Sequence, residues 1–208
     1  MKFKLTIISI ILTFLGNISN ADDFSYDYID IKIGTTNSDA QEKEVYLGAS
    51  KSLNDNFSLR GGLYYQYGDW TKLGKYREQV GTGLYFDIVF NKEITSNTDL
   101  IISSGYSYFN AKAICTPTTG ACSASTNATY QSDIYTATLG LKQKLSDSID
   151  IEALYRFIDV EGSTTNVDQG NLILTKQISN NNSIGIDYSW NTTGADFNRT
   201  GIFLRRDF

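Results

Sequence analysis

Residues 183–190, which read SIGIDYSW, alternate strictly between small or polar residues and large apolar ones. Successive side chains of an extended strand point to opposite faces, so this stretch has one apolar face and one hydrophilic face. Ile184, Ile186 and Tyr188 share the apolar face with Trp190, opposite Asp187. A strand of this kind separates an apolar environment from a polar one.

The same alternation, with a period of two, recurs along the rest of the chain. It is clear in residues 57–67, 80–91, 135–144 and 149–157. It is weaker in residues 24–35, 44–53, 99–110, 167–178 and 199–208. Together with residues 183–190, these segments predict ten strands, with eight as the alternative count.

The connections between these segments are of two kinds, and the two kinds follow each other in turn. Tight polar turns are expected at residues 54–56, 95–98, 147–148 and 180–182. Longer linkers are expected at about 36–43, 69–78, 111–133, 160–166 and 191–198. Short turns at one end and longer loops at the other are typical of outer-membrane barrels.

The strand length decides what the apolar face contacts. A strand of about ten residues rises roughly 33 Å, and a tilt of about 40° leaves about 25 Å along the membrane normal. This height matches the apolar band of a transmembrane barrel, which must be closed because unpaired backbone groups are costly in lipid. The sequence predicts an all-β fold: a single closed antiparallel up-and-down transmembrane β-barrel. The alternative is a soluble secreted β-protein whose apolar faces pack together in two layers.

The first residues predict export. Lys2 and Lys4 precede an apolar run over residues 5–15, and Ser19-Asn20-Ala21 supplies small residues for cleavage. The apolar run is too short to span a bilayer, which needs about 20 residues. We therefore expect a cleaved signal peptide at residues 1–21, a barrel domain at 22–208 and a location in the outer membrane.

Composition argues against several functions. The net charge of −5 disfavours nucleic-acid binding, which needs clustered Lys and Arg. The chain contains no His, the residue most used as a general base and as a metal ligand. We therefore expect a protein without catalysis, cofactor or metal.

Charged residues of both signs lie on the polar face of the expected strands. In a narrow barrel they would point into the lumen, pair with one another and fill it. The expected network consists of Arg60, Asp87, Lys142, Asp150, Glu152, Arg156, Asp187 and Arg205. The carboxylates in it could instead form an acid/base pair, but their regular spacing favours salt bridges.

Two other features concern the ends of the strands. Tyr65, Tyr67, Tyr155, Tyr188 and Trp190 fall near strand ends on the apolar face, as expected of an interfacial aromatic girdle. Cys115 and Cys122 lie in the longest linker and predict a disulfide that closes a short loop. Redox catalysis, the alternative for these cysteines, normally uses the closer Cys-x-x-Cys spacing.

The chain ends inside the last expected strand, where Ile202 and Leu204 lead to the terminal Phe208. Here the sequence resembles the small outer-membrane barrel proteins of the porin-like superfamily, such as the OmpA- and OmpX-like proteins. That resemblance implies that Phe208 is a signal for the outer-membrane assembly machinery. Arg206 departs from the hydrophobic residue usual two positions before the end, and either turns toward the interface or contradicts the assigned face. The opening residues 24–29 and the ten-strand layout resemble the Ax-type barrels.

Two functions remain for such a barrel. The first is a surface or structural role, in which the outer loops contribute to adhesion, envelope integrity or contact with a host or phage. The second is a narrow pore for small solutes or ions, which is disfavoured because side chains usually fill barrels of this size. The expected partners are outer-membrane lipid and lipopolysaccharide, the assembly machinery and an extracellular ligand of unknown nature.

Overall fold

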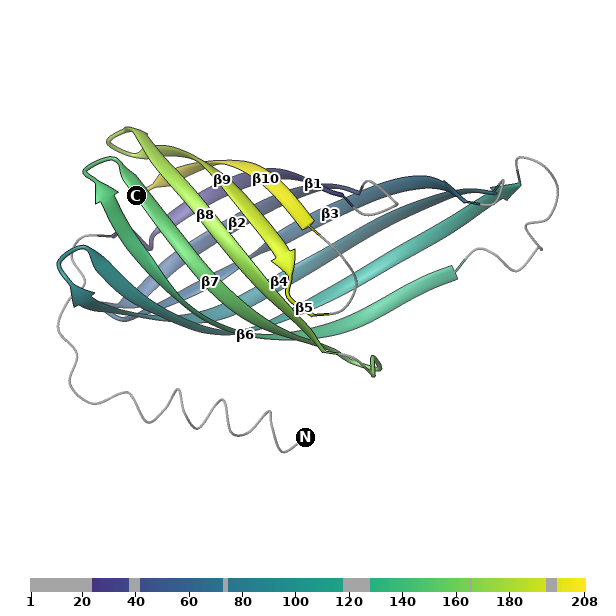
Figure 1. Ribbon diagram of the computed structural model, residues 1–208, viewed down its shortest axis with the longest axis horizontal. Coiled ribbons are helices and arrows are strands. Elements are labelled where there is room, and N and C mark those ends of the chain that lie inside the picture. Colours follow the sequence, from purple (N-terminus) through teal and green to yellow (C-terminus); the bar gives the residue numbers. More distant parts are fainter. Residues whose placement is uncertain (1–23, 38–41, 73–74, 118–127, 165, 194–197) are drawn as a thin grey trace.

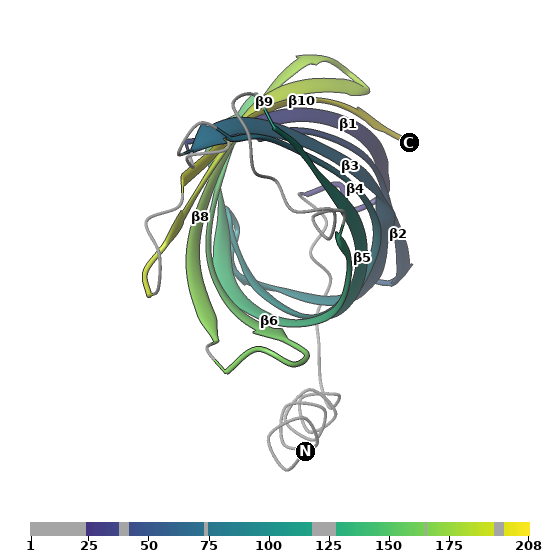
Figure 2. The ribbon, with the colours of Figure 1, turned by 90° about the vertical axis from the view of Figure 1, so that its right-hand side faces the viewer.

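The computed structural model describes residues 24–37, 42–72, 75–117, 128–164, 166–193 and 198–208. Ten antiparallel strands pair in chain order, and β1 also pairs with β10, so that the sheet closes into a barrel (Figures 1 and 2). The strands are β1 (Tyr28–Thr36), β2 (Lys43–Asn54), β3 (Phe57–Lys72), β4 (Lys75–Thr95), β5 (Thr98–Pro117), β6 (Ala128–Ser146), β7 (Ile149–Val160), β8 (Val167–Ser179), β9 (Asn182–Asn191) and β10 (Asn198–Asp207). The predicted ten-stranded barrel is confirmed, and the alternative of eight strands is wrong.

The signal peptide predicted at residues 1–21 lies outside the described residues, as do residues 22 and 23 of the predicted domain. Within the part of the chain that the structure describes, no helix is long and apolar enough to cross a membrane.

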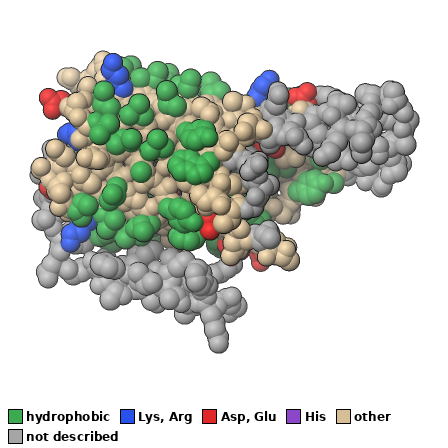
Figure 3. Space-filling model, in the orientation of Figure 1, with side chains coloured by type: hydrophobic (Ala, Val, Ile, Leu, Met, Phe, Trp, Pro, Cys, Tyr) green, Lys and Arg blue, Asp and Glu red, His purple; other side chains and the backbone are tan. Residues whose placement is uncertain are grey.

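The two faces of each strand have opposite surroundings. In β9, Ile186 is 51% exposed on the outside of the barrel, whereas the neighbouring Asp187 is buried in the lumen. The exposed aliphatic and aromatic side chains include Ile31, Leu47, Leu63, Phe86, Leu139, Phe157, Leu174 and Ile202. On the face of the barrel that Figure 3 shows, hydrophobic side chains are spread over the strands as an apolar band. The alternative of two packed layers is wrong, because these side chains point away from the sheet.

The two ends of the barrel differ. At one end, called here the turn end, tight turns at residues 55–56, 96–97, 147–148 and 180–181 join the strands. The chain enters β1 and leaves β10 at this end (Figure 1). The Phe208 amide donates a hydrogen bond to the Asp27 carbonyl over 3.2 Å, which ties the two ends of the chain together. The opposite end, called here the loop end, carries the remaining connections.

Four strands reach far beyond their neighbours at the loop end (Figure 1). Strands β3 to β6 have 16, 21, 20 and 19 residues, whereas β7 to β10 have 10 to 13. Their upper parts, residues 68–72, 75–80, 111–117 and 128–133, form a four-stranded sheet that we call the extension. Most of the linkers predicted at 69–78 and 111–133 are therefore strand. Beyond the closed barrel both faces of an antiparallel sheet can meet water, so the sequence there lacks the alternation that marks the lower strands.

Aromatic residues surround the barrel where the apolar band ends toward the loops. Tyr65, Tyr155 and Tyr188 are exposed on the outer face, and the Tyr188 ring stacks on Trp190 with 5.7 Å between centroids. Tyr106 and Tyr135 add a second ring pair at 5.6 Å. An amphipathic ring at this position suits the boundary between acyl chains and water.

Candidate functional site

The turn end of the lumen is filled by the segment that precedes β1. Phe24 and Tyr26 are buried, and the Tyr26 hydroxyl donates a hydrogen bond to Asp99 Oδ2 over 2.7 Å. The ammonium group of Lys142 lies 4.8 Å from the Phe24 ring centroid and 5.2 Å from that of Tyr26. These contacts bury two aromatic rings beside a cation, a favourable arrangement away from water. We call residues 24–26 the plug.

The plug corrects the sequence prediction, which began the first strand at residue 24. Strand β1 begins at Tyr28, and the described residues before it, 24–27, belong to no strand. Phe24 and Tyr26 have the spacing of a strand face, but they fill the barrel mouth because no sheet edge remains for them in a closed barrel.

An apolar cluster of Val89, Ile101 and Leu154, with Ile173 packed against it, occupies the lumen above the plug. This layer was not predicted, because isolated aliphatic residues on the polar face look like noise in the alternation. Together with the plug, it places apolar side chains in the part of the lumen nearest the turn end.

A cavity of about 380 Å³ lies in the lumen toward the loop end. Tyrosine side chains line one part of it, including Tyr46 and Tyr64, which stack with 5.3 Å between centroids. The charged side chains that line it are Lys32, Arg60, Arg156, Arg199, Arg205, Asp30, Glu44, Asp87 and Asp187. The lining of this cavity is therefore polar and charged.

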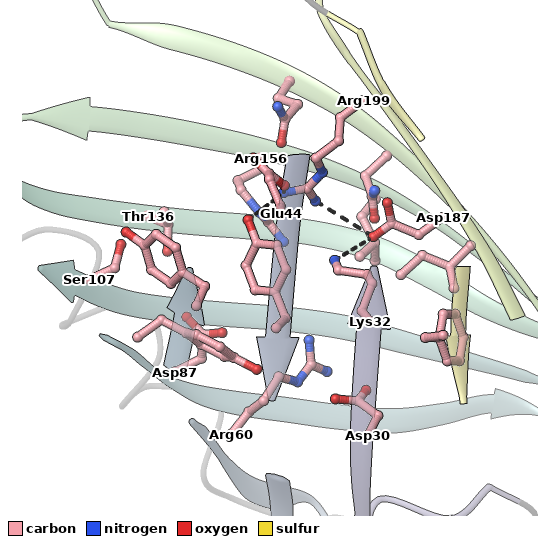
Figure 4. Close-up of a pocket in the computed structure, with 18 of the residues that line it drawn as sticks. Asp30, Lys32, Glu44, Arg60, Asp87, Ser107, Thr136, Arg156, Asp187 and Arg199 are labelled. Atoms are coloured by element: carbon pink, nitrogen blue, oxygen red, sulfur yellow. Dashed lines mark hydrogen bonds and ion pairs between the residues drawn. The ribbon is translucent and has the colours of Figure 1, made fainter. Parts of the chain in front are cut away.

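The upper wall of the cavity holds a connected charge network (Figure 4). Lys32 Nζ lies 2.8 Å from Asp187 Oδ2, and Arg199 lies 3.6 Å from the same oxygen. Arg199 also lies 3.4 Å from Glu44 and donates a hydrogen bond to the Tyr46 hydroxyl over 2.9 Å. One carboxylate thus serves two cations that come from opposite ends of the sequence, which fixes β1 against β9 and β10.

Two further ion pairs lie nearer the turn end. Arg205 lies 3.2 Å from Asp30, and its guanidinium stacks 3.8 Å from the centroid of the Tyr28 ring. Lys142 lies 3.6 Å from Glu152, its direct partner across β6 and β7.

Of the predicted lumen residues, the structure pairs Lys142 with Glu152, Asp187 with Lys32 and Arg199, and Arg205 with Asp30. The other members make no ion pair with a described residue: Arg60, Asp87 and Arg156 line the cavity, and Asp150 faces the lumen near the turn end. Arg60 and Asp87 are cross-strand partners that lie too far apart for an ion pair.

The sequence prediction missed Arg199 and Glu44. Both lie at the loop ends of strands in which the alternation of polar and apolar residues is weak. Counting in steps of two from Arg205 back to Arg199 would have placed the latter in the lumen.

Two carboxyl groups at the barrel mouths have shifted pKa values. At the turn end, burial alone would raise the pKa of Asp27, but hydrogen bonds from the Lys51 ammonium and from Ser52 hold it below its ordinary value. At the loop end, burial and the neighbouring Glu44 carboxylate raise the pKa of Glu42, although Gln66 donates a hydrogen bond to it.

The remaining predicted site residues are the two cysteines and Phe208. The Cys115 side chain and all of Cys122 lie outside the described residues, so their disulfide stays a prediction. Phe208 is 62% exposed at the turn end, with the Lys51 ammonium 5.8 Å from its ring centroid. Among the described residues, no three potential ligands cluster as a metal site would require.

Solved structures of other proteins share this architecture. The translocator domain of the autotransporter NalP from Neisseria meningitidis matches over 100% of this chain and 95% of its own, with a TM-score of 0.57 and 11% identity. The fold is that of outer-membrane β-barrels.

Two further structures agree with this assignment of the fold. The transport unit of the autotransporter AIDA-I from Escherichia coli covers 98% of this chain and 97% of its own, with a TM-score of 0.50 and 10% identity. The NanC porin covers 86% of this chain and 100% of its own, with a TM-score of 0.50 and 9% identity. No known protein family and no curated protein matches the sequence. The finer resemblance to the Ax-type barrels stays a prediction.

Proposed function

We propose that this outer-membrane-type barrel resides in the outer membrane and has a non-catalytic surface role, in which the extension contacts partners outside the cell. The observation that carries this proposal is the extension itself. Backbone pairing continues past the ends of the neighbouring strands as far as the pairs Lys72 with Lys75 and Lys75 with Pro117. A rigid, paired sheet presents its side chains to a partner with a smaller loss of conformational entropy on binding than a loose loop does.

Adhesion, envelope integrity and contact with a host or phage are the roles that such a surface supports. The partners in this proposal are outer-membrane lipid and lipopolysaccharide around the barrel, the assembly machinery during insertion, and an extracellular ligand at the extension. The chain has no His with which to build the common general-base sites, which supports a role in binding.

The second candidate, a narrow pore, is favoured by the charged cavity. The plug and the apolar cluster oppose it, because Phe24, Tyr26, Val89 and Leu154 are all buried on the path that an ion would follow. Ions cross apolar constrictions poorly because they must shed water.

Conductance in a planar bilayer distinguishes the two candidates. We expect no stable single-channel steps from the purified wild-type protein. The double variant Phe24→Ala and Tyr26→Ala, which removes both plug rings, should conduct more than the wild type. Stable steps from the wild type would overturn the order of the two candidates and make the pore the better function.

Exposure of the extension on cells tests the surface role itself. An epitope inserted after Gly120, in the sequence that connects β5 to β6, should be recognised by antibody on intact bacteria. The same epitope inserted after Asp147, in a turn at the opposite end of the barrel, should be recognised only after the outer membrane is opened. Equal recognition of both insertions on intact cells would contradict the proposal.

A further inference from the structure

A repeated pattern marks the turn end of every strand that runs toward the turns. On the outward face, each of these strands ends in an apolar residue, then a cation or amide, then a large apolar residue, at every second position. The five occurrences are Ala49, Lys51 and Leu53; Phe90, Lys92 and Ile94; Leu141, Gln143 and Leu145; Leu174, Lys176 and Ile178; and Leu204, Arg206 and Phe208.

The third residues of the pattern form a ring that we call the rim: Leu53, Ile94, Leu145, Ile178 and Phe208. All five are more than half exposed, from 54% for Ile94 to 62% for Phe208. The charged second residues, Lys51, Lys92, Lys176 and Arg206, form what we call the basic belt. Lys51, Lys92 and Lys176 each lie three residues before the last residue of their strand, and Arg206 lies one residue before the last residue of β10.

The pattern settles the position of Arg206. Its neighbours on the same face, Leu204 and Phe208, are both exposed on the outside of the barrel, so Arg206 also faces outward. The face assigned from the sequence was correct. Arg206 is the last member of the belt, where four other strands carry Lys or Gln.

The height of the membrane places the belt inside the apolar band. The outward apolar residues of β4 run from Leu84 to Ile94, which at about 3.3 Å per residue and a tilt of about 40° spans roughly 25 Å. This is the full height of the apolar band of such a barrel, so the rim is its lower edge. The basic belt lies one outward position above that edge, where an ammonium group must extend along the strand to reach the headgroups.

Three of the four belt residues make no ion pair with a described residue. Lys51 pairs with Asp27, but Lys92, Lys176 and Arg206 have no ion-pair partner among the described residues. Arg and Lys side chains on the visible face also gather at the turn end, beside the apolar band (Figure 3). A cation at a lipid boundary is stabilised when an anion from outside the protein approaches it, as the headgroups of an anionic membrane do.

We propose that the basic belt binds the phosphate groups of phospholipids in the periplasmic leaflet, with the rim packed among the upper parts of their acyl chains. Phosphatidylglycerol, which has a net negative charge, fits this site better than zwitterionic phosphatidylethanolamine. This proposal requires that the barrel lies in a membrane, but it is independent of the role of the extension.

Lipid retention measured by native mass spectrometry tests the proposal. The full chain, folded in detergent, is mixed with equal amounts of phosphatidylglycerol and phosphatidylethanolamine. The variant is Lys92→Gln with Lys176→Gln, which leaves both Lys51 and the C-terminal residues intact. The matched control is Lys43→Gln with Lys112→Gln, which removes two exposed outward lysines from the loop end.

We expect the wild type to retain phosphatidylglycerol preferentially, the belt variant to retain at least twofold fewer molecules of it, and the control to match the wild type. Equal retention by the wild type and the belt variant would overturn the proposal, as would an equal loss in the control. Each protein is first checked by its gel mobility before and after heating. Failure of the wild type to form a heat-modifiable barrel would contradict the membrane location, which separates that outcome from failure of the belt.

Discussion

Asp187 shows at the scale of single residues how the lumen is held together. Its carboxylate accepts a hydrogen bond from Lys32 and forms an ion pair with Arg199, and its side chain is almost completely buried. Removal of such a carboxylate leaves two cations facing each other in a space with little water. Removing one partner of a buried ion pair destabilises the fold by more than the pair itself contributes, because the remaining charge is buried without a partner or water.

We predict that Asp187→Asn destabilises the barrel by about 3 kcal/mol, the lower part of the range for breaking a buried ion pair. The replacement keeps the shape of the side chain, so the loss reports on charge. Urea unfolding in lipid vesicles would measure it. Asp147→Asn, in an exposed turn, should change the free energy of unfolding by less than about 0.5 kcal/mol. Equal effects of the two variants would contradict the role given to Asp187.

Asp27 makes the attachment of the plug depend on pH. Hydrogen bonds from Lys51 and Ser52 hold the pKa of Asp27 below its ordinary value of 3.8, so its carboxylate stabilises the fold in full above that pH. The stabilisation is lost as the pH falls through the lowered pKa. Asp27→Asn should therefore reduce the melting temperature at pH 7 and have a smaller effect at pH 2, where the stabilisation is at least partly lost. Heat-modifiability profiles at the two pH values measure this, and an equal deficit at both would contradict it.

At the scale of strands, the close approach of neighbouring backbones limits the size of the side chains that can point into the lumen. Gly62 of β3 faces Gly48 of β2, and a side chain at position 62 would collide with the Leu47 carbonyl and with the Gly48 backbone. The Tyr85 ring covers both glycines from the neighbouring β4. The ring occupies the space that two side chains would otherwise fill.

We predict that Gly62→Ala destabilises the barrel by about 1–3 kcal/mol, the usual cost of overpacking. The control is Gly201→Ala, where the closest contacts are the methylene groups of Lys32 at 3.2 and 3.3 Å, which can move aside. Urea unfolding would compare them. A control variant as unstable as Gly62→Ala would show that the backbone contact is not the cause.

The strands also show how far a sequence can be interpreted. The alternation in residues 183–190 was enough to predict β9 and both of its faces, because lipid and lumen differ so strongly. The upper parts of β4 and β5 were predicted as linkers, since a sheet with water on both sides gives no such contrast. The ion pairs between β1, β9 and β10 depend on which strands meet when the barrel closes, and no local pattern carries that information.

At the scale of the whole molecule, closure explains the remaining features. With β1 paired to β10, the described sheet has no unpaired edge, and Tyr28 and Asp207, where β1 begins and β10 ends, both lie at the turn end. The outside becomes a continuous apolar band between an aromatic girdle and a basic belt. Polar side chains line the lumen, and the plug occupies its turn end. The extension is the part of the sheet that this arrangement leaves free for contact with other molecules.

The central claim, that apolar side chains face lipid and polar ones face a closed lumen, is tested most directly by a nitroxide scan of residues 183–190 in lipid vesicles. Each position is replaced by Cys in turn in a chain whose Cys115 and Cys122 have been changed to Ser, and is then spin-labelled. We predict that accessibility to oxygen, which concentrates among acyl chains, alternates along β9, with maxima at 184, 186 and 188. Low oxygen accessibility at all three of those positions would contradict the account.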